Sequence, residues 1–306
     1  MFKRALPWIL LLSGWIALAA YICSMFFCSP SIGAAATTNN AIASPSVLAA
    51  PVAKSGVWNY SDGANYSMSH AEFFKFPVGD YEYVKPLTNK FSQSIGNTAT
   101  YLKENPERQL TVTGFYKESE DNTSILPNMG LARAATVKSY IQTLGVPASQ
   151  ILTKGVPTVG NGEENGIITK GIDFSFDTKD GNDERIATIA SRLVGKPLTL
   201  YFQTNQNTPT FTATQRKDLA DMFYYIENVP SSRLAVSGHT DNVGSRNYNV
   251  NLSQERATFV KNYLIEKGSV DGAKLSEQGM GPDKPIMSND TPEGRSKNRR
   301  VEITLQ

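Results

Sequence analysis

The chain contains an internal duplication downstream of residue 56. LTVTGF at 110–115 resembles LAVSGH at 234–239, at an offset of 124 residues. MGLARAATVKSYIQTLGV at 129–146 resembles LSQERATFVKNYLIEKGS at 252–269, at an offset of 123 residues. Self-similarity at a nearly constant offset is the signature of a repeated architecture, so we expect one fold to be built twice.

Both copies alternate strands with helices. In the second copy, Leu219, Met222, Phe223 and Ile226 follow the i, i+3, i+4, i+7 spacing of an amphipathic helix. The pattern predicts an α+β fold of two tandem β/α sandwich domains, with helices on one face of a small mixed sheet. Expected strands lie near 73–76, 110–114 and 171–176, then at 198–202, 234–238 and 300–305. Expected helices lie near 85–104, 131–143, 183–194 (joining the copies) and 219–226, with a last helix capped by Ser253.

A long apolar run opens the chain. Residues 5–28 carry no charge and follow Lys3 and Arg4. At about 1.5 Å per residue, a helix of this length would measure roughly 36 Å, enough to cross a hydrocarbon core of about 30 Å. The two leading cations favour a cytoplasmic N-terminus and export of everything that follows. The run predicts a single transmembrane anchor in the inner membrane, with the soluble domains in the periplasm.

The sequence also leaves open that this N-terminal segment is a cleaved signal peptide. Signal peptides have apolar cores of about 7–15 residues, shorter than this run. Small residues at 33–36 could nevertheless form a cleavage site, which would leave a periplasmic or outer-membrane-associated protein. A lipoprotein anchor is disfavoured because bulky side chains precede Cys23 and Cys28. The predicted organisation is an anchor at 1–28, a flexible Ala/Ser/Thr/Pro/Asn-rich linker at 29–56, and domains at 57–180 and 181–306.

Charge and residue types exclude several classes of protein. Lys and Arg number 30 against 28 Asp and Glu, and without Lys3 and Arg4 the counts are equal. This balance argues against nucleic acid as the main partner, because phosphate binding needs a basic field. Both cysteines belong to the apolar N-terminal part, which leaves no disulfide or thiolate metal site elsewhere. His70 and His239 are the only histidines and lie far apart, which disfavours a His-rich metal centre or a His-based triad. We expect no cofactor and no metal.

The second copy is dense in polar residues and glycines where packing does not require them. They lie in SGHTDNVGSRNYNVNLSQERATFVKNYL at 237–264 and GMGPDKPIMSNDTPEGRSKNRRVEI at 279–303. This combination resembles the OmpA-like peptidoglycan-associated domain family. The family pattern T-D-x-x-G…N-x-x-L-S-x-x-R-A-x-x-V is matched by Thr240, Asp241, Gly244, Asn249, Leu252, Ser253, Arg256, Ala257 and Val260. The downstream pattern is matched by Gly279, Gly281, Pro285, Ile286, Asn289, Thr291, Gly294, Arg295, Asn298, Arg299, Arg300, Val301 and Glu302.

The resemblance implies a ligand, the diaminopimelate of the peptidoglycan stem peptide. The free end of that residue is a zwitterion, which requires a fixed anion for its ammonium and a planar cation for its carboxylate. By resemblance, Asp241 at a strand end takes the ammonium. Arg256, expected in the first turn of the next helix, takes the carboxylate. The resemblance adds Thr240, Asn249, Arg299 and Asn205 to the same pocket.

Each of these residues also has an ordinary structural explanation. An Asp after a strand is often a turn former, and an Arg on a helix is often a solvated cation or a surface ion pair. His239 is expected to be a structural neighbour rather than a catalyst. The segment 298–300 could be a basic strand entry. Only the complete pattern favours a ligand site.

The first copy lacks most of these candidate ligand-binding residues. Phe115-Tyr116-Lys117 replaces His239-Thr240-Asp241, with Glu118 the nearest acid, and Thr169-Lys170-Gly171 replaces Asn298-Arg299-Arg300. Arg133 is retained, but a cation at Lys117 would repel the ligand ammonium. The first domain is therefore predicted to be a degenerate OmpA-like copy that kept the fold and lost the site, serving as a spacer, homodimer surface or partner-binding module.

The sequence discriminates between three classes of function for the whole chain. The favoured one is a binding module that grips peptidoglycan non-covalently from the membrane. Ion conduction by a stator-like subunit is disfavoured because residues 5–28 contain no Asp or Glu, although a structural role in an envelope or motor complex with protein partners stays open. A hydrolase would need paired carboxylates, a metal cluster or an activated nucleophile, and no such motif is visible. The chain is predicted not to be an enzyme.

Overall fold

The computed structural model describes residues 56–179, 183–201 and 209–306. The predicted anchor at 5–28 and all of the predicted linker except Gly56 lie outside the described residues. No helix within the described ranges is both long enough and apolar enough to cross a membrane.

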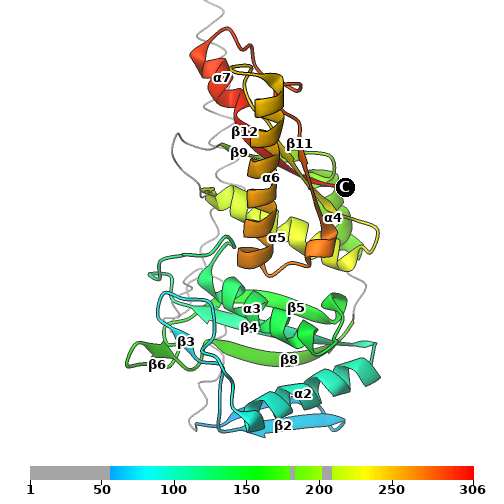
Figure 1. Cartoon of the computed structure of the whole chain (residues 1–306). Helices are drawn as coiled ribbons and strands as arrows, with labels where there is room; N and C mark the ends of the chain where they lie inside the picture. Colours follow the sequence, from blue (N-terminus) through cyan, green and yellow to red (C-terminus); the bar gives the residue numbers. More distant parts are fainter. Residues whose placement is uncertain (1–55, 180–182, 202–208) are drawn as a thin grey trace, which may run out of the picture. The chain divides into compact units, whose positions relative to one another are not determined.

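The first copy contains a three-stranded sheet with helices packed against it. In chain order its elements are β1 (Trp58–Asp62), β2 (Tyr66–His70), β3 (Phe76–Pro77), α2 (Asn89–Glu104), β4 (Arg108–Tyr116), α3 (Met129–Thr143), the 3-10 turn η1 (Ala148–Gln150), β5 (Ile151–Pro157), β6 (Glu163–Glu164), β7 (Ile167–Ile168) and β8 (Ile172–Thr178) (Figure 1). The main sheet has the order β5-β4-β8, and β1-β2 and β3-β7-β6 form two smaller sheets.

The second copy contains a four-stranded sheet. Its elements are α4 (Asp183–Leu193), β9 (Pro197–Tyr201), α5 (Ala213–Asn228), β10 (Leu234–Gly238), α6 (Arg246–Gly268), the 3-10 turn η2 (Gly272–Lys274), β11 (Leu275–Gly279), α7 (Pro292–Asn298) and β12 (Arg300–Leu305). The strand order is β11-β10-β12-β9. Figure 1 shows α6 running along this sheet, where it packs against β10 and β11.

The same pairing occurs in both main sheets. The central strand, β4 or β10, is parallel to the strand that follows the long helix and antiparallel to the last strand of the copy. The register also agrees, because the Phe115 amide donates to the Gly171 carbonyl and the His239 amide to the Arg300 carbonyl, each at 2.8 Å. The predicted α+β class is confirmed.

A strand glycine touches a helix backbone at the same place in each copy. A Cβ on Gly114 would lie 1.8 Å from the Gly130 oxygen, and a Cβ on Gly238 would lie 2.0 Å from the Ser253 oxygen. Glycine is required there because any side chain would separate helix from strand. The contact also aligns the copies residue by residue, since Arg133 and Arg256 each follow the contacting helix residue by three positions.

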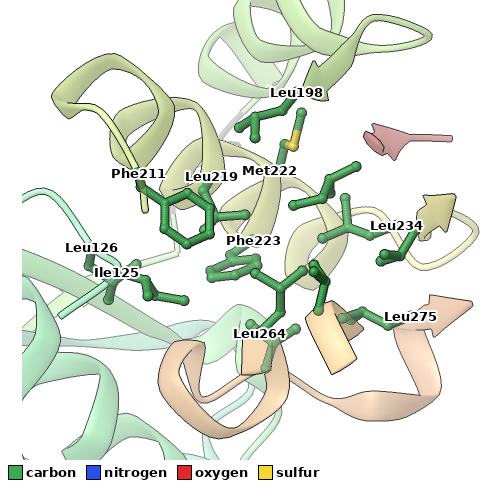
Figure 2. Close-up of a cluster of buried hydrophobic side chains, with 14 of the residues drawn as sticks. Ile125, Leu126, Leu198, Phe211, Leu219, Met222, Phe223, Leu234, Leu264 and Leu275 are labelled. Carbon is green, nitrogen blue, oxygen red and sulfur yellow. The ribbon is translucent and has the colours of Figure 1, made fainter. Parts of the chain in front are cut away.

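The core of the second copy consists largely of aliphatic side chains. Figure 2 shows Leu198, Phe211, Leu219, Met222, Phe223, Leu234, Leu264 and Leu275 as members of one buried cluster. The helical spacing predicted over 219–226 is confirmed by α5, which begins with a reciprocal capping box between Thr212 and Gln215. The first-copy core is richer in aromatic rings, among them Trp58, Tyr60, Phe74, Phe91 and Phe174.

The structure differs from the expected elements in three respects. The last long helix begins at Arg246 and not near Ser253, which lies inside it. Ser245 is the true N-cap, its side chain accepting from the Tyr248 amide at 3.3 Å. The first two turns of α6 are mostly exposed, so hydrophobic periodicity could not reveal them. The strand expected at 73–76 is reduced to β3 at Phe76–Pro77. The sequence pattern does not predict the β1-β2 hairpin, the strands β5, β6, β7 and β11, or the short helix α7.

Gly238→Ala should lower the free energy of unfolding by about 1–3 kcal/mol, because the new methyl group forces α6 away from β10. Gly96→Ala is the matched control, since Gly96 lies within α2 and a Cβ there meets nothing within 4 Å. That control should raise stability by roughly 0.5–1 kcal/mol. Urea unfolding of both variants measures the difference, and wild-type stability of Gly238→Ala would contradict the close contact.

Candidate functional site

Asp241 lies just beyond the end of β10, in the short segment that leads into α6. The residue is buried, and both of its carboxylate oxygens are engaged. Oδ1 accepts a hydrogen bond from the Val243 amide at 3.1 Å, and Oδ2 accepts one from Arg299 Nη1 at 2.8 Å. The carboxylate is thereby held in one orientation.

Arg256 is a half-buried guanidinium on α6. It makes no hydrogen bond or ion pair with any residue that the structure describes. Burial and the positive charge of Arg299 lower its pKa, while the Asp241 charge opposes that shift. Arg256 therefore lies within electrostatic reach of Asp241 and Arg299 without being paired to the carboxylate.

The two residues converge by a different route from the expected one. Arg256 lies ten residues after the first residue of α6, not in its first turn. Only residues 242–245 separate Asp241 from the start of this helix. Gly244 has φ +96°, a conformation that glycine adopts without strain and that permits the sharp turn. The contact between Gly238 and Ser253 then sets the strand end beside the helix turn that carries Arg256.

Further predicted residues surround the same strand end. Thr240 is buried, its amide donates to the Gly281 carbonyl at 3.0 Å, and its hydroxyl has no hydrogen-bond partner among the described residues. The buried Asn249 donates from Nδ2 to the Val243 carbonyl at 3.0 Å, which ties the turn to the helix. Asn205 lies outside the described residues.

The three residues of the segment 298–300 have different roles. The buried Asn298 side chain accepts from the Ile286 and Met287 amides at 2.9 and 3.1 Å and so shapes the loop before α7. Arg299 reaches Asp241. Arg300 is buried and pairs with Glu302 at 2.7 Å. Of these three residues only Arg299 faces the site, and the sequence pattern alone does not distinguish it from its two neighbours.

His239 lies next to the site but is enclosed. It is buried, and its Nε2 is 3.6 Å from Glu302 Oε2. Burial lowers its pKa, and the nearby Arg300 charge lowers it further, while Glu302 opposes the shift. These surroundings suit a neutral structural imidazole.

The first copy differs at the position of Asp241. Lys117 stands there and pairs with Glu163 at 2.5 Å. Within the described part of the chain, neither copy contains a group of His, Cys, Asp and Glu side chains that could hold a metal ion.

Acidification should destabilise the protein in part through His239. Its folded pKa lies below the ordinary value of 6.5, so the unfolded chain takes up the proton first. The stability contributed by the neutral imidazole is present above that value and is lost as pH falls towards the folded pKa. Between about pH 7.5 and about pH 5.5 the loss is up to about 1.4 kcal/mol.

Urea unfolding of His239→Gln at both pH values measures this contribution. The variant should lose less stability on acidification than the wild type does. An identical loss in both proteins would show that His239 titrates alike in the folded and unfolded chains.

Comparison with known proteins places these observations in a family. The model of the OmpA family matches residues 85–173 and 201–299, together more than half of the chain. Peptidoglycan-binding protein ArfA of Mycobacterium tuberculosis is 49% identical over 76 residues, 25% of this chain and 23% of ArfA. The probable lipoprotein YiaD of Escherichia coli is 46% identical over 80 residues, 26% of this chain and 36% of YiaD.

Other relatives cover similarly limited parts. Outer membrane protein Omp38 of Acinetobacter baumannii is 37% identical over 108 residues, 35% of this chain and 30% of Omp38. The match therefore spans only between 23% and 36% of the length of these three relatives.

Solved structures are similar over about a third of the chain. The peptidoglycan-associated lipoprotein of Burkholderia pseudomallei is 25% identical, with 35% of this chain and 89% of that chain covered, at a TM-score of 0.31. The C-terminal domain of Helicobacter pylori MotB is 27% identical, with 36% and 84% covered, at a TM-score of 0.30. The resemblance seen in the sequence is confirmed by the family model, and the chain belongs to the OmpA family.

Proposed function

We propose that this protein is a non-enzymatic, membrane-anchored component of the cell envelope. It binds peptidoglycan non-covalently, through the diaminopimelate of the stem peptide, at the site on its second copy. The observation that carries the proposal is a buried, oriented carboxylate at Asp241 close to an Arg256 guanidinium that no described residue pairs. The similarity to a relative named as a peptidoglycan-binding protein supports it.

The charges of the site complement an amino-acid zwitterion. Asp241 takes the ligand ammonium, and the free fork of Arg256 takes the carboxylate through two parallel hydrogen bonds. Arg299 neutralises part of the Asp241 charge and holds it in place. Two guanidiniums around one carboxylate leave an excess positive charge, which favours the ligand carboxylate. The unpartnered Thr240 hydroxyl offers a further hydrogen bond, and Asn205 and Asn249 complete the proposed pocket.

The rest of the chain positions this site in the envelope. Residues 5–28 are proposed to anchor the chain in the inner membrane, with the linker carrying both copies into the periplasm. The two copies are proposed to be tandem domains. The first is proposed to act as a degenerate spacer, homodimer surface or partner-binding module.

Arg256→Ala and Asp241→Ala should each weaken co-sedimentation with diaminopimelate-type sacculi. Hydrogen bonds to charged groups are worth about 1.5–3 kcal/mol, so the dissociation constant should rise on the order of 10- to 100-fold. Arg256→Lys should recover only part of the affinity, because an ammonium lacks the planar fork. Free diaminopimelate should compete with sacculi for the wild-type protein.

Matched controls lie on exposed positions of the same copy. Arg246→Ala and Asp283→Asn break an exposed ion pair, change the net charge by the same amounts, and should bind sacculi normally. Undiminished binding by both site variants would refute the assigned pocket. It would favour the alternative that the two copies mainly bind protein partners within an envelope or motor complex.

Replacing residues 1–28 with a cleavable signal sequence should release the protein from the membrane fraction. The apolar run is the proposed attachment, so its removal should leave both copies in the soluble periplasm. Fractionation followed by immunodetection measures the change. Continued retention in detergent-extractable membranes would point to a different attachment.

A further inference from the structure

Arg133 of the first copy is the structural counterpart of Arg256. The two glycine contacts fix this equivalence, because Gly130 stands against Gly114 as Ser253 stands against Gly238. Each arginine follows three residues later on the same helix. The arginine of the site was therefore retained in the first copy.

The surroundings of Arg133 differ from those of Arg256. Arg133 is completely buried, and both of its terminal nitrogens bind the Glu120 carboxylate, Nη2 to Oε1 and Nη1 to Oε2. Nη1 also donates to the Phe115 carbonyl at 2.9 Å and Nε to the Asp80 carbonyl at 3.2 Å. The guanidinium carbon lies 5.7 Å from the centre of the Phe76 ring. This is the two-pronged pairing that an arginine makes with a bound carboxylate.

The chain supplies Glu120 through an ordered loop between β4 and α3. The Glu120 amide donates to the Lys117 carbonyl at 2.9 Å, which closes a turn. Asn122 organises the following residues, with its Oδ1 accepting from the Ser124 amide at 3.0 Å and its Nδ2 donating to the Leu126 carbonyl at 2.7 Å. In the second copy the counterparts of residues 123–128 are instead helical and form the first turns of α6. The Glu120 side chain is only 8% exposed, so it seals the guanidinium from solvent.

We propose that the first copy retains a carboxylate-binding site at Arg133 and fills it with Glu120 of its own chain. The ligand class is a small carboxylate, and the loop at 117–128 is a built-in ligand. The two copies then differ in occupancy as well as in residue type: the Arg256 site is open to an external carboxylate, and the Arg133 site is already filled. An external ligand enters the first copy only by displacing Glu120. The inference does not require that the second copy binds peptidoglycan.

Chemical rescue of Glu120→Ala in the full chain tests the proposal. Removing the carboxylate leaves a buried, unpaired guanidinium, so the melting temperature in chloride should fall on the order of 10 °C. Acetate or formate at the same ionic strength should enter the vacated space and raise the melting temperature with concentration, as a ligand of the folded state does. Wild-type protein in the same salts corrects for general salt effects.

Two variants make the result specific. Glu163→Ala removes an exposed partner of Lys117, and its melting temperature should follow that of the wild type in both salts. In Glu120→Ala with Arg133→Met, acetate should have no effect beyond the wild-type response. If Glu120→Ala is unfolded in chloride, recovery of its native circular dichroism in acetate supports the site. Equal behaviour of Glu120→Ala in acetate and chloride, after the wild-type correction, would overturn it.

Discussion

Backbone-to-backbone contact between a central strand and its long helix organises each copy. At Gly238 and Ser253, and again at Gly114 and Gly130, the absence of a side chain lets the helix lie directly on the strand. The strand end and one helix turn are then neighbours, although many residues separate them in sequence. A carboxylate placed after the strand and a guanidinium on that turn become part of one site as a consequence of packing.

What that site can bind depends on which of its charged groups have no hydrogen-bond partner within the protein. Asp241 is oriented by Arg299 and the Val243 amide, whereas Arg256 finds no hydrogen-bond partner among the described residues. Arg133, at the same place in the first copy, is completely buried and donates hydrogen bonds to the Glu120 carboxylate and to two backbone carbonyls. An unpaired, half-buried guanidinium is suited to an external carboxylate, whereas one that is already paired with a carboxylate of its own chain stabilises the loop that supplies it.

Sequence reasoning recovered the α+β class, most of the helices and the central strands β4 and β10, because hydrophobic periodicity reports directly on buried faces. It also brought Asp241, Thr240, Asn249, Arg256 and Arg299 to one region through a family pattern. It did not predict β5 or β11, the strands parallel to those two central strands. It misplaced the start of α6, because residues 246–252 are mostly exposed and carry no apolar period.

Two features of the first copy could not be predicted from the sequence pattern. The β1-β2 hairpin has no counterpart in the repeat. The nearest acid in the sequence, Glu118, is exposed, and Glu120 is the residue that folds inward to Arg133. The conformation of the loop determines which of the two glutamates points inward, and residue spacing in the sequence does not predict that conformation.

The central claim is that one zwitterion is held between Asp241 and Arg256. A crystal structure of the soluble chain with a diaminopimelate-containing stem peptide tests it most directly. The account predicts the ligand carboxylate on both terminal nitrogens of Arg256 and its ammonium within hydrogen-bond distance of Asp241. A peptide bound elsewhere, or bound here with its free amino-acid end pointing into solvent, would contradict the account.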